Sequence, residues 1–572
     1  MSNFSRMHTN YTNSSSKSFN HELSNNQSSS QNLLYSIETG IHTSKHQPIS
    51  LNSDPFHDVV SCIFSHKHNG ETALVDSASG DSISYSELKL LVRSMASGLQ
   101  KEFGVCKGDV VLILLPNSIY YPVVLLGVLY LGAVVTTMNP LSSFSEVKKQ
   151  TLGGHVSLGF TVVDRVNDLE LIGVRSIVVP DNVRVGSNEA QFGSFYKLIY
   201  GDHEFVPCRN IKQDDTAAIL YSSGTTGSSK GVVLSHRNLI CGVELFVRFE
   251  ASQYEGPPEE NVYLAVVPMF HIYGLTLFTL GILSLGTKIV VMKKFSDGDM
   301  VRAIDRYKVT HFPGVPPLLT ALIKAGKGGD AKRLKSLKQV SCGAAPLSTR
   351  IIEEFMCCFP QVDFIQGYGM SESTAVGTRG FNTRDVHNYT SAGLLAPNMQ
   401  AKVVDWVTGL HLPPGKTGEL WLRGPAIMKE YLNNADATLS TIDNDGWLHT
   451  GDIVYFDQDG YLYIVDRVKE IIKYKGFQIA PADLEDVLVS HPAILDAAVT
   501  GVRDEEAGEI PVGFVVMRPG AKASESSIID FVAKQVAPYK KLRRVMFTNM
   551  IPRSAAGKIL RRQLKDQLYS RL

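Results

Sequence analysis

The chain has 572 residues, of which 44% are hydrophobic and 20% are charged. Its 56 lysines and arginines balance its 56 aspartates and glutamates, so the formal net charge is zero. This composition is typical of a globular protein and excludes a disordered tail protein, a collagen-like fibre and a disulfide-stapled miniprotein. It lacks the basic excess of a nucleic-acid-binding protein, so no nucleic-acid partner is expected. The seven cysteines show no zinc-site spacing.

Residues 1–50 are rich in serine and asparagine and poor in aliphatic side chains. Such a segment buries too little apolar surface to offset the entropy lost on ordering. The sequence therefore predicts a disordered extension over residues 1–50. It contains no apolar stretch of the kind found in a secretory signal.

From residue 51 onward, short β-branched runs alternate with longer helical patterns, which predicts an α/β fold with layered sheets and helices. The two longest apolar stretches, 123–135 and 275–286, are shorter than a bilayer requires, so no membrane span is expected. Strand patterns bounded by turns suggest a small β-rich subdomain at 400–465. We expect a large N-terminal domain at 51–465 and a smaller, mobile α+β C-terminal domain at 466–572.

Residues 221–231 read Tyr-Ser-Ser-Gly-Thr-Thr-Gly-Ser-Ser-Lys-Gly, where a strand runs into a loop of glycines and hydroxyls. Glycines let backbone N–H groups approach phosphate oxygens, hydroxyls add donors, and a lysine adds charge. The spacing differs from a Walker A loop, in which lysine directly follows the second glycine. The loop predicts phosphate contacts from Ser222, Ser223, Gly224, Thr225, Thr226, Gly227 and Lys230.

Six further motifs follow this loop in order, and together they resemble the adenylate-forming superfamily of acyl-CoA synthetases, luciferases and peptide-synthetase adenylation domains. They are Pro-Met-Phe-His-Ile-Tyr-Gly at 268–274, Gln-Gly-Tyr-Gly-Met-Ser-Glu at 366–372, Thr-Gly-Asp at 450–452, Val-Asp-Arg-Val-Lys-Glu at 465–470, Lys-Tyr-Lys-Gly-Phe-Gln at 473–478 and Arg-Ser-Ala-Ala-Gly-Lys at 553–558. The likeness covers about residues 55–572 and is closest to plant 4-coumarate:CoA ligase-like, peroxisomal acyl-activating enzymes.

The resemblance implies an ATP-dependent carboxylic acid:CoA ligase that forms an acyl-AMP intermediate and then a CoA thioester, with AMP and pyrophosphate as products. ATP, coenzyme A and Mg²⁺ are the implied co-substrates and cofactor. The chemistry is reasonable because a carboxylate is a poor acyl donor, and joining it to a polyanionic nucleotide requires counter-charge.

The resemblance also implies roles for individual residues. Lys558, His271 and Glu372 would be catalytic, with Glu372 holding the metal and Asp466 acting as the hinge. ATP or AMP would contact, besides the phosphate loop, Gln366, Gly367, Tyr368, Ser371, Asp452, Arg467, Lys469, Lys473, Gln478 and Lys558. Coenzyme A would contact Lys294, Lys475 and Gly476. The acid would contact Tyr273, Ala344, Gln366 and Gly367.

The chain ends in Ser570-Arg571-Leu572, a close variant of the Ser-Lys-Leu peroxisomal address. We expect a peroxisomal location with the import receptor as a partner, and the cytoplasm is the alternative. Leu-Trp-Leu at 420–422 departs from the cysteine-centred version of true coumarate ligases. Relatives with these features imply fatty acids or oxylipin precursors of jasmonate as substrates, with hydroxycinnamates also open.

Three other functions share some of these features. A luciferase-like oxygenase has the same motifs and would emit light with its luciferin. A peptide-synthetase adenylation domain is expected to pass its acyl group to a carrier domain, and no carrier sequence follows Lys558. A non-catalytic peroxisomal acyl-binding protein would be expected to lack Lys558, Glu372 or the phosphate loop, and all of these are present.

Overall fold

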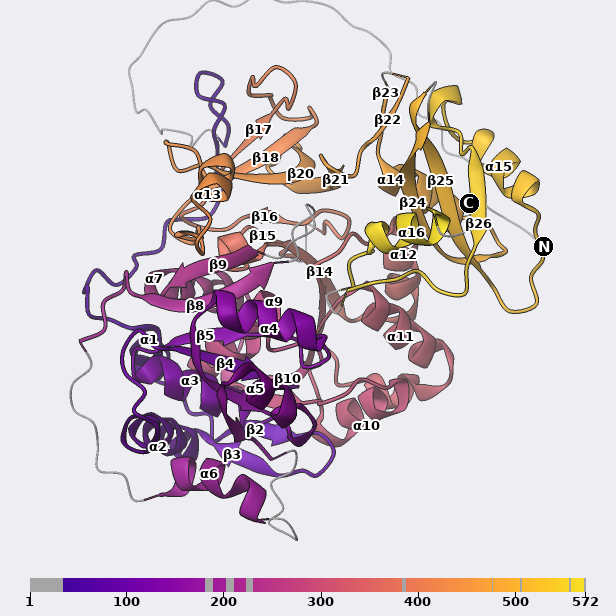
Figure 1. Ribbon diagram of the computed structural model, residues 1–572. Coiled ribbons are helices and arrows are strands. Elements are labelled where there is room, and N and C mark those ends of the chain that lie inside the picture. The colour runs from indigo at the N-terminus through magenta and orange to yellow at the C-terminus, as the bar shows by residue number, and fades with distance from the viewer. Residues whose placement is uncertain are drawn as a thin grey trace, which may run out of the picture. The chain divides into compact units, whose positions relative to one another are not determined.

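The computed structural model describes residues 34–180, 189–201, 210–222, 230–382, 387–475, 477–504, 507–554 and 557–569. Its sheets and helices form a mixed α/β structure with a large N-terminal part and a smaller C-terminal part (Figure 1). The predicted fold class is confirmed. The predicted domain boundaries remain predictions.

The first large sheet is parallel in its centre and antiparallel at one edge. In spatial order, its described strands are β19 (Glu430–Tyr431), β9 (Lys230–Ser235), β8 (Thr216–Ser222), β5 (Val134–Thr137), β4 (Val110–Leu114), β6 (Val156–Thr161) and β7 (Arg175–Val178). The central strands are buried, as expected for a parallel sheet with helices on its faces.

The second large sheet also has a parallel centre, with short antiparallel pairings at both ends. In spatial order, its described strands are β16 (Leu394–Leu395), β15 (Thr378–Arg379), β14 (Asp363–Tyr368), β13 (Gln339–Cys342), β12 (His311–Gly314), β10 (Val262–Ala265), β11 (Lys288–Val291), β2 (Thr72–Asp76) and β3 (Ser82–Ser84).

Several helices of the large part begin at a residue whose side chain accepts a hydrogen bond from a free backbone N–H group. Helix α2 (Tyr85–Phe103), for example, begins after Ser84, whose hydroxyl accepts from the N–H of Glu87, and ends at Gly104 in a left-handed conformation. The others are α1 (Val59–Ser65), α3 (Tyr121–Tyr130), α4 (Phe144–Gly153), α5 (Val166–Ile172), α6 (Glu189–Tyr200), α7 (His236–Cys241), α8 (Phe249–Ser252), α9 (Ile272–Gly274), α10 (Asp297–Tyr307), α11 (Pro316–Lys327), α12 (Thr349–Cys358) and α13 (Ala435–Thr441), with π-helical turns η2 (Gly242–Arg248) and η4 (Leu275–Gly281).

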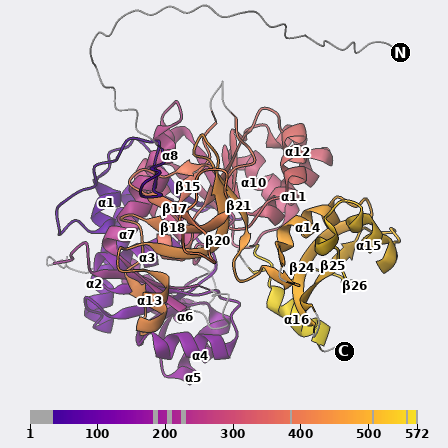
Figure 2. The same ribbon diagram turned by 90° about the horizontal axis from the view of Figure 1, so that it is seen from above.

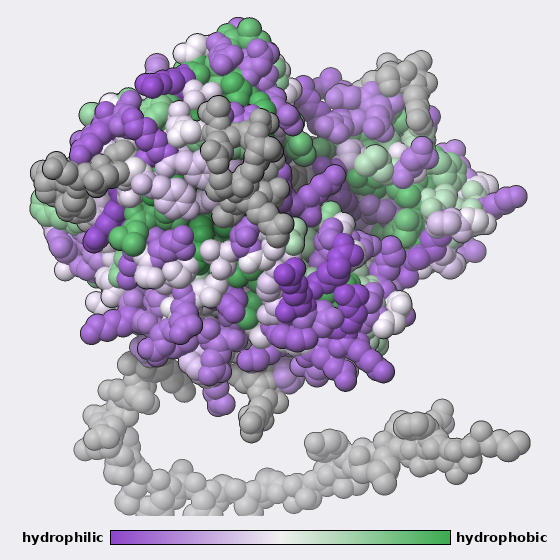
Figure 3. Space-filling view, turned by 90° about the horizontal axis from the view of Figure 1, so that it is seen from below, coloured by the Kyte–Doolittle hydropathy of each residue, from purple (hydrophilic) through white to green (hydrophobic). Residues whose placement is uncertain are grey.

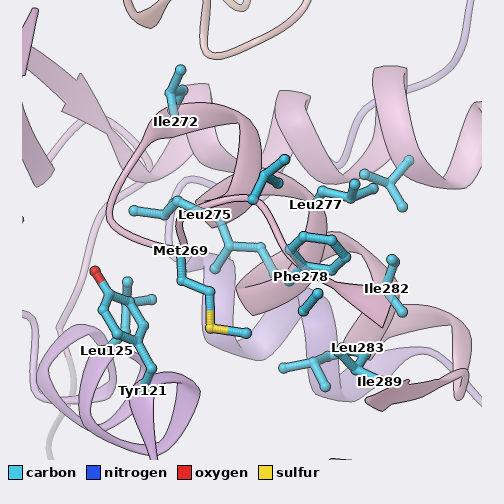
Figure 4. Packing of buried hydrophobic residues seen from close by; sticks show 14 of the residues in the cluster. Tyr121, Leu125, Met269, Ile272, Leu275, Leu277, Phe278, Ile282, Leu283 and Ile289 are labelled. Carbon is cyan, nitrogen blue, oxygen red and sulfur yellow. The ribbon is translucent and has the colours of Figure 1, made fainter. Parts of the chain in front are cut away.

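The two long apolar stretches form the centre of the core. Helix α3 is buried along its whole length, and so is η4. Figure 4 shows Met269 near Tyr121 and Leu125 of α3, and Leu275 and Phe278 belong to the same buried cluster. In the described part of the chain, no helix is both long enough and apolar enough to cross a membrane.

A third, antiparallel sheet joins β1 (His42–Thr43), β17 (Gln400–Val404), β18 (Gly418–Arg423), β20 (Leu448–Phe456) and β21 (Leu462–Arg467). Strand β1 corrects the disorder prediction, which is wrong for residues 34–50. His42 is buried and stacks on Phe456 with ring centroids 4.4 Å apart, and Ile49 exchanges two backbone hydrogen bonds with the Asn398 side chain. These long-range contacts order a segment that is poor in aliphatic residues. Residues 1–33 lie outside the described residues.

The C-terminal part is a sheet with helices on both faces (Figure 2). Its strands are β22 (Ile472–Tyr474), β23 (Phe477–Ile479), β24 (Ile494–Asp504), β25 (Gly508–Met517) and β26 (Arg544–Phe547). Alternate strand residues face two separate clusters, one under α14 (Pro481–Val489) and α15 (Glu525–Ala533) and one under α16 (Arg561–Tyr569). Figure 3 shows a face of the molecule on which hydrophilic residues predominate and apolar residues lie between them in small groups.

Candidate active site

A cavity of about 1200 Å³ lies where strands β5, β8 and β14 end. The carboxyl ends of parallel strands are the usual place for a ligand site in open α/β sheets. The loops and turns that follow these strands line the cavity, together with β20, the end of β21, Ser554 and Lys558. Residues from six of the seven predicted motifs are therefore brought to one place by elements far apart in the sequence, and the described residues of the motif at 473–478 contribute none.

One corner of the cavity holds a buried carboxylate. Glu372 follows β14 in a tight turn, and it is only 6% exposed. Its Oε1 accepts hydrogen bonds from the Ser222 hydroxyl at 3.0 Å and from the Tyr431 hydroxyl at 2.9 Å. Lys230 lies over the Tyr431 ring, with Nζ 4.6 Å from the centroid. This corner thus combines a fixed carboxylate with a nearby cation.

A second corner is built by the pairing of β20 with β21, which places Asp452 opposite Arg467. Asp452 is 5% exposed; its Oδ2 accepts from the Tyr368 hydroxyl at 2.6 Å, and its Oδ1 lies 3.0 Å from Nε of Arg467. Burial and the neighbouring Asp452 charge raise the pKa of the Tyr368 phenol well above its usual range. The phenol therefore remains a hydrogen-bond donor to this carboxylate.

Another part of the cavity wall is apolar. Its cavity-lining residues include Leu245, Phe246, Phe270, Ile272, Tyr273, Ala344 and Val376. His271 caps α9, its Nδ1 accepting from the Tyr273 N–H at 3.5 Å. Burial, with a smaller effect of the Lys558 charge, lowers the pKa of His271 to about 4, so this imidazole is neutral near pH 7.

Lys558 reaches the cavity from a turn that its own loop stabilises. The Ser554 N–H donates to the Lys558 carbonyl at 2.8 Å, and the Gly557 N–H donates to the Ser554 carbonyl at 2.8 Å. Gly557 has φ +78°, a conformation that favours glycine, and it lies against Val315 and Pro317 at the start of α11. Burial and then the Arg467 charge lower the pKa of the Lys558 ammonium, while Asp452 and Glu372 oppose this shift.

Asp466, the predicted hinge, is buried just before Arg467. Its two carboxylate oxygens accept from the backbone N–H groups of Arg467 at 2.7 Å and Ala482 at 3.0 Å. Burial raises the pKa of Asp466 to about 6. Close by, Arg561 of α16 forms ion pairs with Glu470 and with Glu485, the latter at 2.6 Å.

The structure brings many of the predicted residues together in this cavity. The described ones that line it are Ser222, Lys230, His271, Tyr273, Ala344, Gly367, Tyr368, Ser371, Glu372, Arg467, Lys469 and Lys558, and Asp452 contacts two of them. Ser223, Gly224, Thr225, Thr226, Gly227, Gly476 and Ser570-Arg571-Leu572 lie outside the described residues, as does the side chain of Gln478.

Besides Asp452, four predicted contact residues with described side chains do not line this cavity. Gln366 donates from Nε2 to the Tyr389 carbonyl at 2.8 Å. Lys294, Lys473 and Lys475 are exposed, and Lys475 lies next to Tyr474 with Nζ 6.0 Å from the ring centroid. The Gln366 amide therefore contacts a neighbouring segment in this structure, and its contact with the nucleotide and the acid stays a prediction.

Sequence reasoning also missed functional-site residues. Tyr431 bonds to Glu372, and Arg379 lines the cavity while pairing with Glu250. Neither belongs to a motif whose spacing suggests a site. The Arg561 pairs were missed as well, since Arg561 in sequence looks like part of a solvated basic face.

Comparisons with known proteins agree with this geometry. The family described as AMP-binding enzyme matches residues 64–432, and the family described as AMP-binding enzyme C-terminal domain matches residues 483–558. The chain is 59% identical to 4-coumarate–CoA ligase-like 6 of Arabidopsis thaliana, covering 94% of this chain and 96% of that protein. It is 44% identical to peroxisomal OPC-8:0-CoA ligase 1 of the same plant, covering 91% and 95%.

Among solved structures, O-succinylbenzoate coenzyme A synthetase from Bacillus subtilis, in complex with ATP and a magnesium ion, matches with a TM-score of 0.75 at 27% identity. The match covers 89% of this chain and 99% of that one. The family matches span both the large part and the C-terminal part that carries Lys558. The chain therefore belongs to the family of AMP-binding enzymes.

Proposed function

We propose that the protein is an ATP-dependent carboxylic acid:CoA ligase, an AMP-forming acyl-CoA synthetase that uses Mg²⁺, ATP and coenzyme A. The observation that carries this proposal is the position of Lys558. Its ammonium faces the same cavity as Glu372 and Arg467, and Asp452 and Glu372 are close enough to affect its pKa. A lysine placed among carboxylates in a cavity can balance the negative charge of a nucleotide joined to an acid.

The cavity walls support a division between the nucleotide and the acid. Asp452 offers carboxylate oxygens to a ribose diol, and Arg467 is held beside it by their 3.0 Å ion pair. The nucleotide would lie on this side, in contact with Ser222, Lys230, Tyr368, Ser371, Arg467 and Lys469. The phosphate contacts of Ser223 to Gly227 remain predictions. The more apolar side, near Tyr273, Ala344 and Gly367, would receive the acyl part.

The donor set near Glu372 fits Mg²⁺. The ion prefers hard oxygen ligands and is usually held by one or two carboxylates together with substrate phosphates. Glu372 is a buried carboxylate on the cavity wall, and both of its recorded side-chain hydrogen bonds go to Oε1. When bound there, the ion would offset part of the triphosphate charge.

In the first half-reaction, an oxygen of the substrate carboxylate attacks the α-phosphorus of ATP, and the bond to the pyrophosphate oxygen breaks. Lys558 donates to the oxygens on which charge grows, and the neutral His271 leaves the carboxylate unprotonated. In the second half-reaction, the sulfur of coenzyme A attacks the acyl carbon, and AMP leaves with the electron pair of the broken C–O bond. The thiol proton passes to solvent or to the leaving phosphate.

The thiol step would use a different face of the C-terminal part. Lys475 with Gly476, and Lys294 from the large part, are proposed to contact coenzyme A, while Lys473 and Gln478 contact the nucleotide. The exposed positions of Lys294, Lys473 and Lys475 support this proposal only if the C-terminal part moves. Asp466, which links β21 to the N-terminus of α14 through its two backbone hydrogen bonds, is the proposed hinge.

The substrate is proposed to be a fatty or oxylipin acid or a hydroxycinnamate, in keeping with the apolar wall and with the named relatives. A peroxisomal location is proposed on the 44% identity to a peroxisomal ligase. The full-length chain with a fluorescent protein at its N-terminus should then co-localise with a peroxisomal marker, and a diffuse cytoplasmic signal would contradict this.

The test of the function is a panel of carboxylic acids with purified protein, ATP and Mg²⁺, scored by pyrophosphate exchange into ATP and then, with coenzyme A, by thioester mass and AMP release. We expect acid-dependent exchange and an equimolar yield of thioester and AMP. Exchange without thioester, or light on addition of a luciferin, would favour the oxygenase. Binding of acids with no exchange would favour an acyl-binding protein.

A further inference from the structure

A charged residue, Arg379, lines the cavity beside the apolar residue Phe246. Arg379 of β15 lines the cavity and pairs through Nε with Glu250 of α8; the two residues are 8% and 6% exposed. Burying an ion pair contributes little net stability compared with apolar packing of the same volume. Its presence on a substrate-binding wall therefore calls for a functional account.

The guanidinium is held rigidly. Phe246 and Glu250 are four positions apart, on successive turns of the helix formed by η2 and α8. The Arg379 guanidinium lies 5.1 Å from the Phe246 ring centroid and donates a hydrogen bond to Glu250. These two contacts with one helix face hold the guanidinium in position, and Glu250 neutralises its charge. From the other side, β14 pairs Gly367 with Arg379, and a Cβ on Gly367 would meet Nη1 at 2.9 Å.

The terminal nitrogens of this guanidinium are the free donors. Within the described residues, the hydrogen bond recorded for the Arg379 side chain leaves from Nε. Neither Nη1 nor Nη2 is among the described side-chain nitrogens that are fully buried and lack a partner. Since neither has a hydrogen bond to a described residue, both keep some exposed surface. Because Arg379 lines the cavity, these donors have access to a bound acid.

The geometry points to Arg379 as a specificity-determining residue: its terminal N–H groups recognise an uncharged oxygen, a hydroxyl or carbonyl, on the acyl part of the substrate. This inference rests on the proposed function and names a substrate class for the same site. Glu250 neutralises Arg379, so the pair offers donors without net positive charge. A diacid would gain no net attraction from the neutralised pair, because its second carboxylate would also meet the negative charge of Glu250. Plain aliphatic or aromatic acids would leave the donors without a partner, which is costly in a buried site.

The experiment measures acid-dependent pyrophosphate exchange for two matched series. One is cinnamate, 4-hydroxycinnamate and 4-carboxycinnamate; the other is octanoate, 8-hydroxyoctanoate and octanedioate. In the series that the enzyme uses, we expect kcat/KM for the hydroxy acid to exceed that for the unsubstituted acid about 10-fold or more. It should exceed that for the diacid by a similar factor. Equal values for the hydroxy and unsubstituted acids would overturn the inference.

Two variants separate recognition from folding. Arg379→Met combined with Glu250→Gln removes both charges, and it should bring the hydroxy and unsubstituted acids to within about threefold of each other. Glu250→Gln alone leaves an uncompensated cation and should raise the relative kcat/KM for the diacid. Arg248→Met removes the ion pair with Glu244 within η2, and neither residue lines the cavity, so this variant should keep the wild-type ratios.

The outcomes remain distinguishable from failure of the function itself. If wild-type protein catalyses no exchange with any acid, the proposed ligase activity fails. If it exchanges pyrophosphate but the double variant keeps the wild-type preference, the ligase stands and the role of Arg379 fails.

Discussion

Lys558 and the hairpin that carries Lys473 and Lys475 belong to the same small C-terminal part, yet they have different surroundings. Lys558 lies on the cavity wall, where burial lowers its pKa. Lys473 and Lys475 are exposed and do not line the cavity. The described structure therefore shows one face of the C-terminal part engaged with the cavity and the other free of it.

The difference teaches how one module could serve two chemical steps. Joining an acid to ATP requires a cation among anions, and only Lys558 of these three lysines meets that condition here. Attack by a thiol requires that pyrophosphate has left and that a new wall is present. The C-terminal part carries Lys558 at the cavity and Lys473 and Lys475 outside it, and the buried Asp466 lies where this part begins. Such an arrangement suits a movement that replaces Lys558 by the other lysines between the two steps.

The largest expected effect concerns Lys558, the one of these three lysines that lines the cavity. Lys558→Ala should lower pyrophosphate exchange by about 10²–10³-fold or more, because a preorganised donor to the developing charge is lost. Thioester formation from chemically supplied acyl-AMP should stay near the wild-type rate. The matched control is Arg562→Ala on the exposed face of α16. Full exchange activity of the Lys558 variant would remove this lysine from the adenylation step.

The next effect concerns the wall that Lys558 faces. Asp452→Asn should raise KM for ATP by about 10-fold, because the Arg467 pair and the ribose acceptor are both weakened. It should change the acid KM much less. Steady-state kinetics with ATP and acid varied separately measure this split, with Asp445→Asn on the exposed surface as the control. Equal changes in both KM values would indicate a general loss of structure instead.

The sequence was sufficient to predict the features that depend on local pattern. Short β-branched runs predicted the strands of an α/β fold, and the spaced motifs predicted one site for Tyr368, Glu372 and Lys558, which all line one cavity. The fold-class prediction succeeds because a strand or a helix is determined largely by neighbouring residues. The ends of parallel strands then bring their loops together without further information.

The features that the sequence could not predict all depend on distant pairing. Arg379 and Glu250 are 129 positions apart, and Arg561 is 91 positions from Glu470. The order of residues 34–50 depends on β17, more than 350 positions away. Gln366 belongs to a predicted motif, and its side-chain amide donates a hydrogen bond to the Tyr389 carbonyl, 23 positions away. Composition and spacing contain no signal for such contacts.

The third prediction addresses the exposed face. Lys475→Ala should slow thioester formation from acyl-AMP and coenzyme A by about 10-fold, since a phosphate or backbone contact of coenzyme A would be lost. Pyrophosphate exchange should be unchanged, which is the reverse of Lys558→Ala. Lys522→Ala, another exposed lysine of the C-terminal part, is the control. An unchanged KM and rate with coenzyme A would show that this face does not serve the thiol step.

The smallest expected effect concerns the junction between the two faces. Burial raises the pKa of Asp466 to about 6, so the folded protein holds this proton more tightly than the unfolded chain, whose aspartate pKa is about 3.8. The contribution to stability is therefore complete below about pH 3.8 and is lost as the pH rises through about 6. Asp466→Asn should remove about 1–3 kcal/mol of this pH dependence.

Thermal unfolding measured from pH 4.5 to 7.5 checks the prediction, with the exposed Asp459→Asn variant as the control. The wild type should lose stability relative to Asp466→Asn as the pH rises, because only the wild type must ionise a buried carboxyl. An ionised Asp466 also accepts backbone N–H groups more strongly from Arg467 and Ala482. If the two proteins keep a constant difference across this range, Asp466 is ionised throughout, and its two backbone hydrogen bonds outweigh its burial.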